Sequence, residues 1–271
     1  DLAGVQGLWG LQDLKTLHES CSGARAAVIV GGGLIGIELA EMLHSRGLHV
    51  TFLVRERSYW SSILPPEESQ MVNREIERHG VELKLGAQLK EIQDDGRGRV
   101  GAVLTDQGER LACQLVGLTT GVSPNLDVLK DTPIRCGRGV LVDRSLRTSV
   151  TDVYAAGDCA EIETGGAKNL LQQVWYTGKL QGELAAEVIA GEERVYEPGT
   201  WYNSAKFFDL EYQTYGRVNL KVAGEENLYW EHASGRKALR LAHLGGKVIG
   251  INVMGLRLRH GVGQQQVVVH G

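Results

Sequence analysis

The chain has 271 residues, of which 42% are apolar and 23% are charged, and its 29 basic and 33 acidic side chains give a formal net charge of −4. A chain of this size can bury a sizeable core and is expected to divide into two or three domains. No run of like charges indicates a nucleic-acid or membrane surface, and no apolar stretch approaches the roughly 20 residues of a membrane span. No secretory signal opens the sequence, so a cytoplasmic location is the default expectation.

The first strongly patterned segment predicts a strand, a glycine turn, a helix and a second strand. Residues 26–30 are apolar, and after three glycines Leu39 and Leu43 recur at helical spacing. Gly47 is expected to end that helix, and residues 49–54 are expected to form the next strand. This order is typical of a βαβ unit.

Gly31, Gly33 and Gly36 have the spacing G-x-G-x-x-G within this unit. In a dinucleotide-binding fold the first glycine allows a tight turn, the second allows the backbone to approach a pyrophosphate, and the third allows close packing of helix on strand. The helix N-terminus also presents free N–H groups to the phosphates. A glycine-rich turn can be purely structural, but its place between two strands favours dinucleotide binding.

The end of the second strand bears on the choice of nucleotide. NAD-binding folds usually place a carboxylate there, whereas a nearby arginine accommodates the 2′-phosphate of NADP. Here Val54 stands where the acid is expected, Arg55 follows it, and Glu56 comes next. The pattern favours NADPH, while Glu56 leaves NADH open. The alternative is that Arg55 and Arg57 are solvated surface charges.

Further along the chain, residues 65–80 predict a second helix and residues 81–85 a further strand. Residues 88–116 alternate in short runs around glycine turns, which predicts a β-meander. A helix is expected to start near Asn169, and from Glu192 onward the alternation predicts an antiparallel sheet.

This order of elements, together with "LTTGVSPN" at residues 118–125 and "TSVTDVYAAGDCAE" at residues 148–161, resembles the pyridine nucleotide-disulfide oxidoreductase family of two-dinucleotide flavoproteins. The resemblance covers about residues 1–190 and implies an α/β fold with a Rossmann-like NAD(P) domain, a meander and a C-terminal α+β domain with an antiparallel sheet. The implied divisions are a connecting segment (1–24), the NAD(P) domain (25–124), the second segment of an FAD domain (125–191) and a dimerisation-type domain (192–271).

The resemblance also assigns residues to the NAD(P) cofactor. The turn and the start of its helix would bind the pyrophosphate, through Gly31, Gly33, Leu34, Ile35 and Gly36. Glu38 matches the glutamate that such enzymes place near the nicotinamide, and Gly121 would lie against the bound nucleotide. Leu34 falls where many members carry an aromatic gate over the flavin, so an aliphatic side chain there departs from the family pattern.

Gly157 and Asp158 would contact the flavin. Family members use this aspartate to accept hydrogen bonds from the ribityl hydroxyls, and the helix expected near Asn169 would point at the pyrimidine edge of the ring. The alternative is that Asp158 caps the next helix. Cys159 is interpreted as a small buried residue, and none of the four cysteines forms a C-x-x-C pair or a metal-ligand cluster, so no metal is expected.

The family's first FAD-binding segment, with its own G-x-G-x-x-G, has no counterpart in the sequence, and we expect it to lie upstream of residue 1 or on a partner chain. That segment also carries the redox-active cysteines of disulfide reductases. A catalytic His-Glu pair is not recognisable, and His260 and His270 are interpreted as surface histidines.

The resemblance implies an FAD-dependent NAD(P)H oxidoreductase. Hydride would pass from the nicotinamide to the flavin and then to a small-molecule acceptor, such as a disulfide, or to a small redox protein. The C-terminal sheet matches in position the domain through which the family usually dimerises, so the resemblance also implies a homodimer. The alternative, from a different functional class, is that the protein is a non-catalytic NAD(P)H-binding module or regulatory subunit without flavin.

Overall fold

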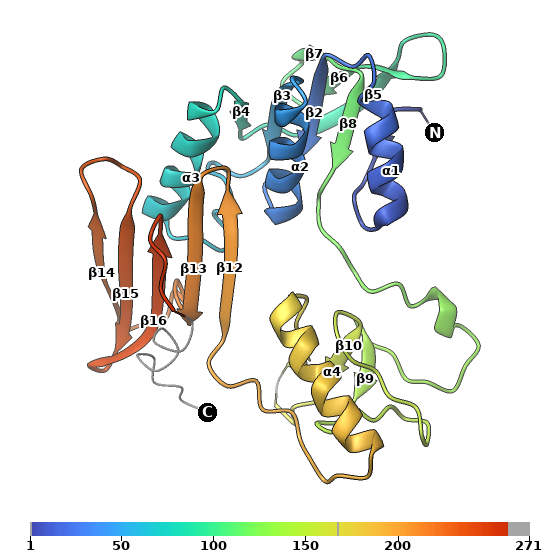
Figure 1. Ribbon diagram of the computed structural model, residues 1–271, viewed down its shortest axis with the longest axis vertical. Coiled ribbons are helices and arrows are strands. Elements are labelled where there is room, and N and C mark those ends of the chain that lie inside the picture. Colours follow the sequence, from blue (N-terminus) through green and yellow to red (C-terminus); the bar gives the residue numbers. More distant parts are fainter. Residues whose placement is uncertain (1, 167, 260–271) are drawn as a thin grey trace. The chain divides into compact units, whose positions relative to one another are not determined.

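The computed structural model describes residues 2–166 and 168–259, and the chain divides into two compact units (Figure 1). Within the described residues, one unit combines residues 2–121 with residues 204–259, and the other covers residues 122–166 and 168–203. Among the described residues, no helix is both long enough and apolar enough to span a bilayer. His260 and His270 lie outside the described residues.

The first unit is built on a five-stranded parallel sheet. Its strand order is β1-β8-β2-β3-β4, with bounds Val5–Gln6, Leu115–Leu118, Ala26–Val30, His49–Val54 and Glu82–Leu85. In the register Val28 lies opposite Thr51 on β3 and Val116 on β8. Both faces of β2 and β3 are buried, as expected for strands inside a parallel sheet.

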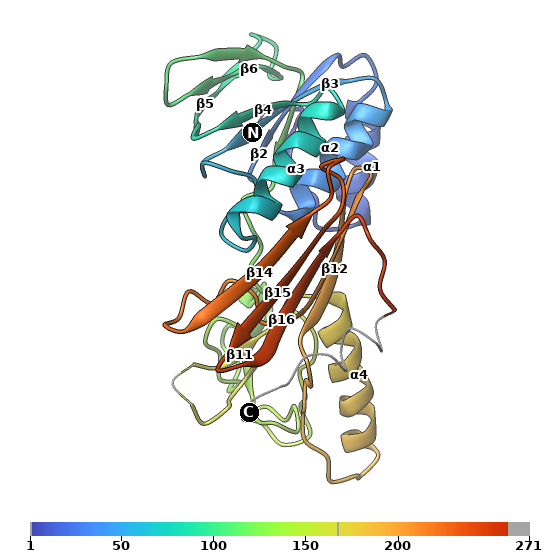
Figure 2. The ribbon, with the colours of Figure 1, turned by 90° about the vertical axis from the view of Figure 1, so that its left-hand side faces the viewer.

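Three helices cover one face of the parallel sheet (Figure 2), namely α1 (Leu11–Ser20), α2 (Leu34–Ser45) and α3 (Pro66–Arg78). Ile29 and Phe52 pack on this face among buried side chains of the helices. The helix predicted over residues 65–80 is confirmed, and it begins at Pro66, where a missing N–H costs nothing.

The opposite face of the sheet is covered by the antiparallel meander β5-β6-β7 (Leu89–Asp94, Val100–Thr105 and Arg110–Ala112). Val28 and Leu53 of the parallel sheet share a buried core with Val103 of β6. The predicted meander is therefore confirmed up to Ala112, but the last part of the predicted range, from Leu115, joins the parallel sheet instead. Residues 115–117 are buried on both faces, which is typical of a strand inside a parallel sheet. A meander strand would alternate buried and exposed residues.

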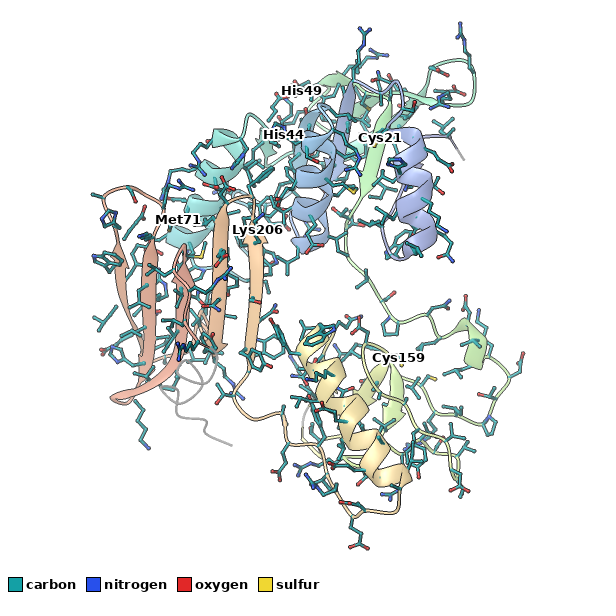
Figure 3. All side chains as sticks on the ribbon, in the orientation of Figure 1. Cys21, His44, His49, Met71, Cys159 and Lys206 are labelled. Atoms are coloured by element: carbon teal, nitrogen blue, oxygen red, sulfur yellow. The ribbon has the colours of Figure 1, made fainter. Side chains whose placement is uncertain are left out.

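Residues 202–254 contain a second sheet of five strands, in the order β12-β13-β16-β15-β14. Their bounds are Tyr202–Phe207, Leu210–Gly216, Lys247–Met254, Ala238–Leu244 and Glu225–Glu231. β13 pairs with β16, β14 with β15 and β15 with β16 in the antiparallel sense, so the predicted antiparallel sheet is confirmed. Phe207, Tyr212 and Met254 belong to the same core as the helices of the first unit. Lys206, which is labelled on β12 in Figure 3, adds an ion pair with Glu41 of α2, with 2.8 Å between Nζ and Oε1.

The second unit contains a small sheet and one long helix. The strands β9 (Val140–Val142) and β10 (Ala160–Ile162) are parallel, and β11 (Leu170–Leu171) joins β10 in the antiparallel sense. The short 3₁₀ helix η1 (Asp127–Leu129) precedes them, and α4 (Trp175–Ile189) follows.

The expected helix start near Asn169 is wrong. Leu170 and Leu171 pair with β10, and the Asn169 side chain donates to Glu161 at 3.2 Å, so α4 begins only at Trp175. Pairing with a neighbouring strand satisfies the backbone of these residues and removes the need for a helix there.

A buried ion pair connects the C-terminal sheet to α3. Arg240 on β15 donates from Nε to Glu68 Oε1 at 2.7 Å and from Nη2 to Glu67 Oε2 at 2.6 Å. The Glu68 carboxylate is fully buried, and Asn252 donates to it at 3.3 Å. Burial of both partners makes the pair costly to break, because either charge alone would be left without compensation.

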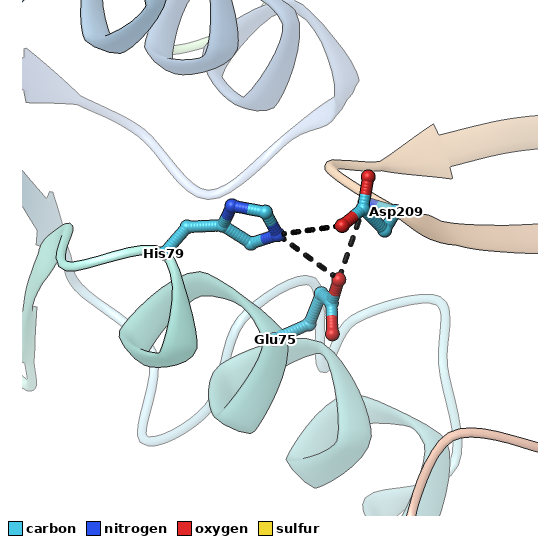
Figure 4. Close-up of side chains that lie close together, drawn as sticks. All are labelled: Glu75, His79 and Asp209. Carbon is cyan, nitrogen blue, oxygen red and sulfur yellow. Dashed lines mark hydrogen bonds and ion pairs between the residues drawn. The ribbon is translucent and has the colours of Figure 1, made fainter.

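A second polar contact lies at the tip of the β12–β13 hairpin (Figure 4). His79 Nε2 lies 3.3 Å from both Glu75 Oε1 and Asp209 Oδ2, and the imidazole stacks on Phe208 at 4.5 Å between ring centroids. Arg78 also pairs with Glu75. Because a guanidinium already faces both carboxylates of the group, we interpret it as an ion-pair network that anchors the hairpin.

Replacement of Arg240 by Met should lower the free energy of unfolding by about 3–5 kcal/mol, because the buried Glu68 carboxylate would lose its cation. Urea denaturation followed by circular dichroism measures this loss. Glu67→Gln is the matched control, since Glu67 is half exposed and its loss should cost less than about 1 kcal/mol. Equal losses for the two variants would contradict the assignment.

Candidate functional site

The largest concentration of predicted site residues lies in a cavity at the carboxyl ends of β2, β3 and β8. Its volume is about 510 Å³. It is lined by the glycine turn, by Arg55 and Glu56 after β3, and by Thr119 and Gly121 after β8. The chain leaves β2 toward β3 on one side and returns through β8 on the other, so the cavity lies where the strand order reverses. Parallel α/β sheets bind ligands at this place.

The three motif glycines differ in what surrounds them. A Cβ on Gly31, whose φ is +118°, would lie 2.5 Å from the Thr119 carbonyl oxygen, and a Cβ on Gly36 would lie 2.9 Å from Thr119 Oγ1. A Cβ on Gly33 would meet nothing within 4 Å. Two glycines therefore allow the turn to pack against β8, and the third leaves open space beside the backbone.

The N-terminus of α2 adjoins this open space. Gly33 is the N-cap, and Leu34 and Ile35 begin the helix. The first N–H groups of a helix have no partner within it, and the first turn of α2 carries no acidic side chain. Such an end attracts an anion through its N–H groups and its dipole.

The structure brings together some of the predicted nucleotide residues and not others. Gly31, Gly33, Arg55 and Gly121 all line the cavity. Leu34, Ile35 and Gly36 sit at the start of α2 beside it, whereas Glu38 is exposed on the helix and does not line the cavity. A contact of Glu38 with the nicotinamide therefore stays a prediction.

Arg55 and Glu56 are paired with each other at the mouth of the cavity. Arg55 donates from Nη2 and Nε to Glu56 Oε1 at 2.8 and 3.2 Å. The Arg55 side chain is 72% exposed, so the guanidinium can turn toward a ligand at little cost. The site thus has a positive side chain, Arg55, and a negative one, Glu56, at the end of β3. Dinucleotide-binding folds distinguish NADP from NAD at this position.

Sequence reasoning missed three residues of the cavity region: Tyr59, Trp60 and Thr119. Thr119 is buried and donates from Oγ1 to the Val30 carbonyl at 3.0 Å, which joins the ends of β8 and β2. Trp60 lines the cavity, and Tyr59 donates from its hydroxyl to the Gly33 carbonyl at 2.7 Å. Two consecutive aromatic residues in the loop that follows β3 were the signal that could have indicated Tyr59 and Trp60.

In the second unit, Gly157 and Asp158 form a turn before β10. Gly157 has a φ of +83°, and its N–H donates to Gln181 Oε1 on α4 at 2.7 Å. Asp158 is exposed and is followed by a strand, so the alternative that it caps the next helix is wrong. Gln181, which is fully buried, is a further residue that the sequence did not indicate.

The four cysteines are free thiols. Cys113 is buried between the meander and the sheet, and burial raises the pKa of its thiol to about 11. It therefore stays protonated at neutral pH, and a protonated thiol is a poor nucleophile. Cys159 lies next to Asp158 and its thiol contacts the Ala156 carbonyl.

Comparison with known proteins places this geometry in a family. The model of the pyridine nucleotide-disulphide oxidoreductase family matches residues 5–182. The chain belongs to this family. The resemblance seen in the sequence is therefore confirmed, as is the mixed α/β fold with its Rossmann-like sheet.

Curated relatives carry reductase names. The chain is 32% identical over 194 residues to the ferredoxin–NAD(+) reductase component of the biphenyl dioxygenase system of Paraburkholderia xenovorans, covering 71% of this chain and 47% of that protein. It is 34% identical over 208 residues to the NAD(P)H coenzyme A polysulfide/persulfide reductase of Pyrococcus horikoshii, covering 73% and 44%. The chain thus spans about half the length of the curated relatives it matches.

Solved structures show the same fold over nearly the whole chain. A ferredoxin reductase from Rhodopseudomonas palustris superimposes with a TM-score of 0.83 at 24% identity, covering 94% of this chain and 62% of that one. An FAD-dependent pyridine nucleotide-disulphide oxidoreductase from Desulfovibrio vulgaris superimposes with a TM-score of 0.81 at 25% identity, covering 97% and 68%. These likenesses extend into the C-terminal sheet, beyond the residues that the family model matches.

Gly31→Ala and Gly33→Ala should differ in stability, since they differ in space and in φ. Alanine at position 31 needs a left-handed conformation and meets the Thr119 carbonyl, so we expect a loss of about 2 kcal/mol or more. Alanine at position 33 enters open space and should cost at most about 1 kcal/mol, as a poorer N-cap than glycine. Urea unfolding of both variants checks this order, and equal losses would contradict it.

Proposed function

We propose that the chain is the NAD(P)H-binding portion and part of the flavin-binding portion of an FAD-dependent oxidoreductase. With both cofactors bound, the nicotinamide would supply a hydride to the flavin, and the reduced flavin would supply its two electrons to an acceptor. The observation that carries this proposal is the cavity at the place where the strand order of the parallel sheet reverses. There Gly33, which has open space beside its backbone, adjoins the N-terminus of α2. Membership of the family agrees with it.

The protein's part at the nucleotide is binding and orientation. The backbone at Gly33 leaves room for the pyrophosphate, and the N–H groups of Leu34 and Ile35 supply donors to it. Gly121, which is exposed with a φ of +122°, lets the chain after β8 pass close to the nucleotide. Glu38 is proposed to lie near the nicotinamide on family resemblance alone.

The paired charges at the cavity mouth favour NADPH and keep NADH open. A 2′-phosphate would offer the Arg55 guanidinium a doubly charged acceptor in place of the Glu56 carboxylate, which lies 2.8 Å away. Without the phosphate, Glu56 can accept hydrogen bonds from the ribose hydroxyls.

The flavin portion rests on the Gly157–Asp158 turn. The exposed Asp158 carboxylate suits the ribityl hydroxyls as an acceptor, and Gly157, held by Gln181, fixes the turn that presents it. The residues present therefore fit FAD, which would supply the redox chemistry when bound. The N-terminus proposed to face the pyrimidine edge of the flavin is that of α4, at Trp175.

The acceptor is proposed from the relatives. Several are named as reductases of ferredoxin, rubredoxin or persulfide, which makes a small redox protein or a sulfur compound the expected acceptor class. We further propose a cytoplasmic homodimer that pairs through the C-terminal sheet. We also propose that the chain divides into a connecting segment (1–24), the NAD(P) domain (25–124), the second segment of an FAD domain (125–191) and a dimerisation-type domain (192–271).

The test of the function is a visible absorption spectrum of the natural full-length product, recorded without oxygen before and after NADPH or NADH is added. Flavin bands that bleach with one nucleotide would support the oxidoreductase and identify its donor. A colourless protein, or bands that neither nucleotide changes, would favour the flavin-free binding module.

Arg55→Ala should weaken binding of NADPH by about tenfold or more, the usual worth of a hydrogen bond to a charged group, while NADH binding changes less than about twofold. Quenching of tryptophan fluorescence by each nucleotide gives both dissociation constants. Arg57→Ala is the matched control, because Arg57 is exposed and does not line the cavity. Equal losses of NADPH and NADH affinity would defeat the preference for NADPH.

A further inference from the structure

We propose that Tyr59 is a positioning residue for the dinucleotide. Its hydroxyl holds the Gly33 carbonyl so that the N–H of the same peptide group, that of Leu34, faces the pyrophosphate. The inference rests on the proposed function, and it assigns part of the nucleotide affinity to a side chain that never touches the nucleotide.

The first argument is the state of the hydroxyl itself. Tyr59 is fully buried, and its hydroxyl donates to the Gly33 carbonyl oxygen at 2.7 Å. Burial raises the pKa of the phenol far above its ordinary value, so the hydroxyl keeps its proton and acts as a donor. The carbonyl of Gly33 also accepts from the Ile37 N–H at 3.3 Å, which occupies both of its acceptor positions.

The second argument is the geometry of a peptide group. A trans peptide is planar, and its C=O and N–H point in opposite directions. With the Gly33 carbonyl held by Ile37 and Tyr59, the Leu34 N–H must point away from them, toward the N-terminal end of α2. That end adjoins the cavity, which Gly33 lines. A carbonyl rotated out of this position would instead present a partial negative charge to a phosphate.

The third argument is how firmly Tyr59 is held. Its N–H donates to Asn73 Oδ1 at 2.9 Å, and its carbonyl accepts from Ser69 Oγ at 2.6 Å, both on α3. Its ring lies edge-on to Phe52 of β3 at 5.2 Å and to Phe207 of β12 at 6.4 Å. Tyr59 is therefore held by contacts from the parallel sheet, from α3 and from the C-terminal sheet. These contacts fix the position of its hydroxyl.

The residue after Tyr59 supports the same interpretation. Trp60 has a φ of +53°, a left-handed conformation that is costly for a bulky side chain. Its carbonyl accepts from the N–H groups of Ile63 and Leu64, both at 3.0 Å, and its ring packs against Tyr212. Trp60 also lines the cavity. Backbone strain of this kind persists where the surrounding structure enforces the conformation, and residues with such strain are often found at ligand-binding sites.

The experiment uses the 271-residue chain and its Tyr59→Phe variant, which keeps the ring and removes the hydroxyl. The matched control is Tyr212→Phe, which removes a buried hydroxyl that contacts Asn252 at 3.4 Å in the C-terminal sheet. Dissociation constants for NADPH and NADH come from fluorescence titration. The amide signal of Leu34 is followed by ¹H–¹⁵N NMR as NADP⁺ or adenosine, which has no phosphate, is added.

We expect Tyr59→Phe to weaken binding of the preferred nucleotide by about fivefold, the worth of one ordinary hydrogen bond, and Tyr212→Phe to change it less than twofold. The shift of the Leu34 amide on addition of NADP⁺ should shrink in Tyr59→Phe alone, and adenosine should bind both variants as it binds the unmodified chain.

Unchanged affinity and an unchanged Leu34 shift in Tyr59→Phe would overturn the inference and leave Tyr59 as a packing residue, whatever its effect on stability. If the unmodified chain itself bound neither nucleotide, the proposed function would fail and this inference with it. The two failures are therefore distinguishable.

Discussion

The contact between the glycine turn and the end of β8 is the constraint on which the site depends. The backbones at Gly31 and Thr119 approach so closely that a methyl group on Gly31 would lie 2.5 Å from the Thr119 oxygen. Gly36 brings the first turn of α2 against the same residue. Because of this close contact, the glycine turn and the N-terminus of α2 lie beside the carboxyl ends of the strands. The cavity is lined by the turn and by these strand ends.

The C-terminal sheet takes part in this arrangement although it comes from the far end of the chain. Arg240 ties it to the buried Glu68 of α3, and Phe207 packs on Tyr59. The ring of Tyr59 therefore has the C-terminal sheet on one side and the glycine turn within reach of its hydroxyl. The C-terminal sheet therefore packs against the residues that lie behind the nucleotide cavity.

The second unit solves a similar problem with different means. Gly157 adopts a left-handed conformation, and the buried Gln181 of α4 accepts its N–H. The turn that exposes Asp158 is thus fixed by one amide side chain rather than by close packing of glycines. In both units the residue expected to face the ligand is positioned by a buried side chain from another element, which favours a preformed site.

Local patterns in the sequence were enough for the family, the order of elements and the glycines. A βαβ unit shows its periods of two and 3.6 residues within a short segment, and Gly31 in the turn has a backbone geometry that only glycine meets easily. The same holds for Gly157, and for the alternation that indicated the C-terminal sheet. These features depend on neighbours in the chain, so they can be recognised without the fold.

Only the tertiary structure decided which other residues serve the site. Arg240 and Glu68 are 172 positions apart, and Gly33 and Tyr59 are 26 apart, so no local period connects them. The start of α4 was mispredicted for a related reason, because Leu170 and Leu171 pair with a strand that the helical pattern does not reveal. Periodicity records which face of an element is buried, but the partner that buries it is chosen by packing between distant segments.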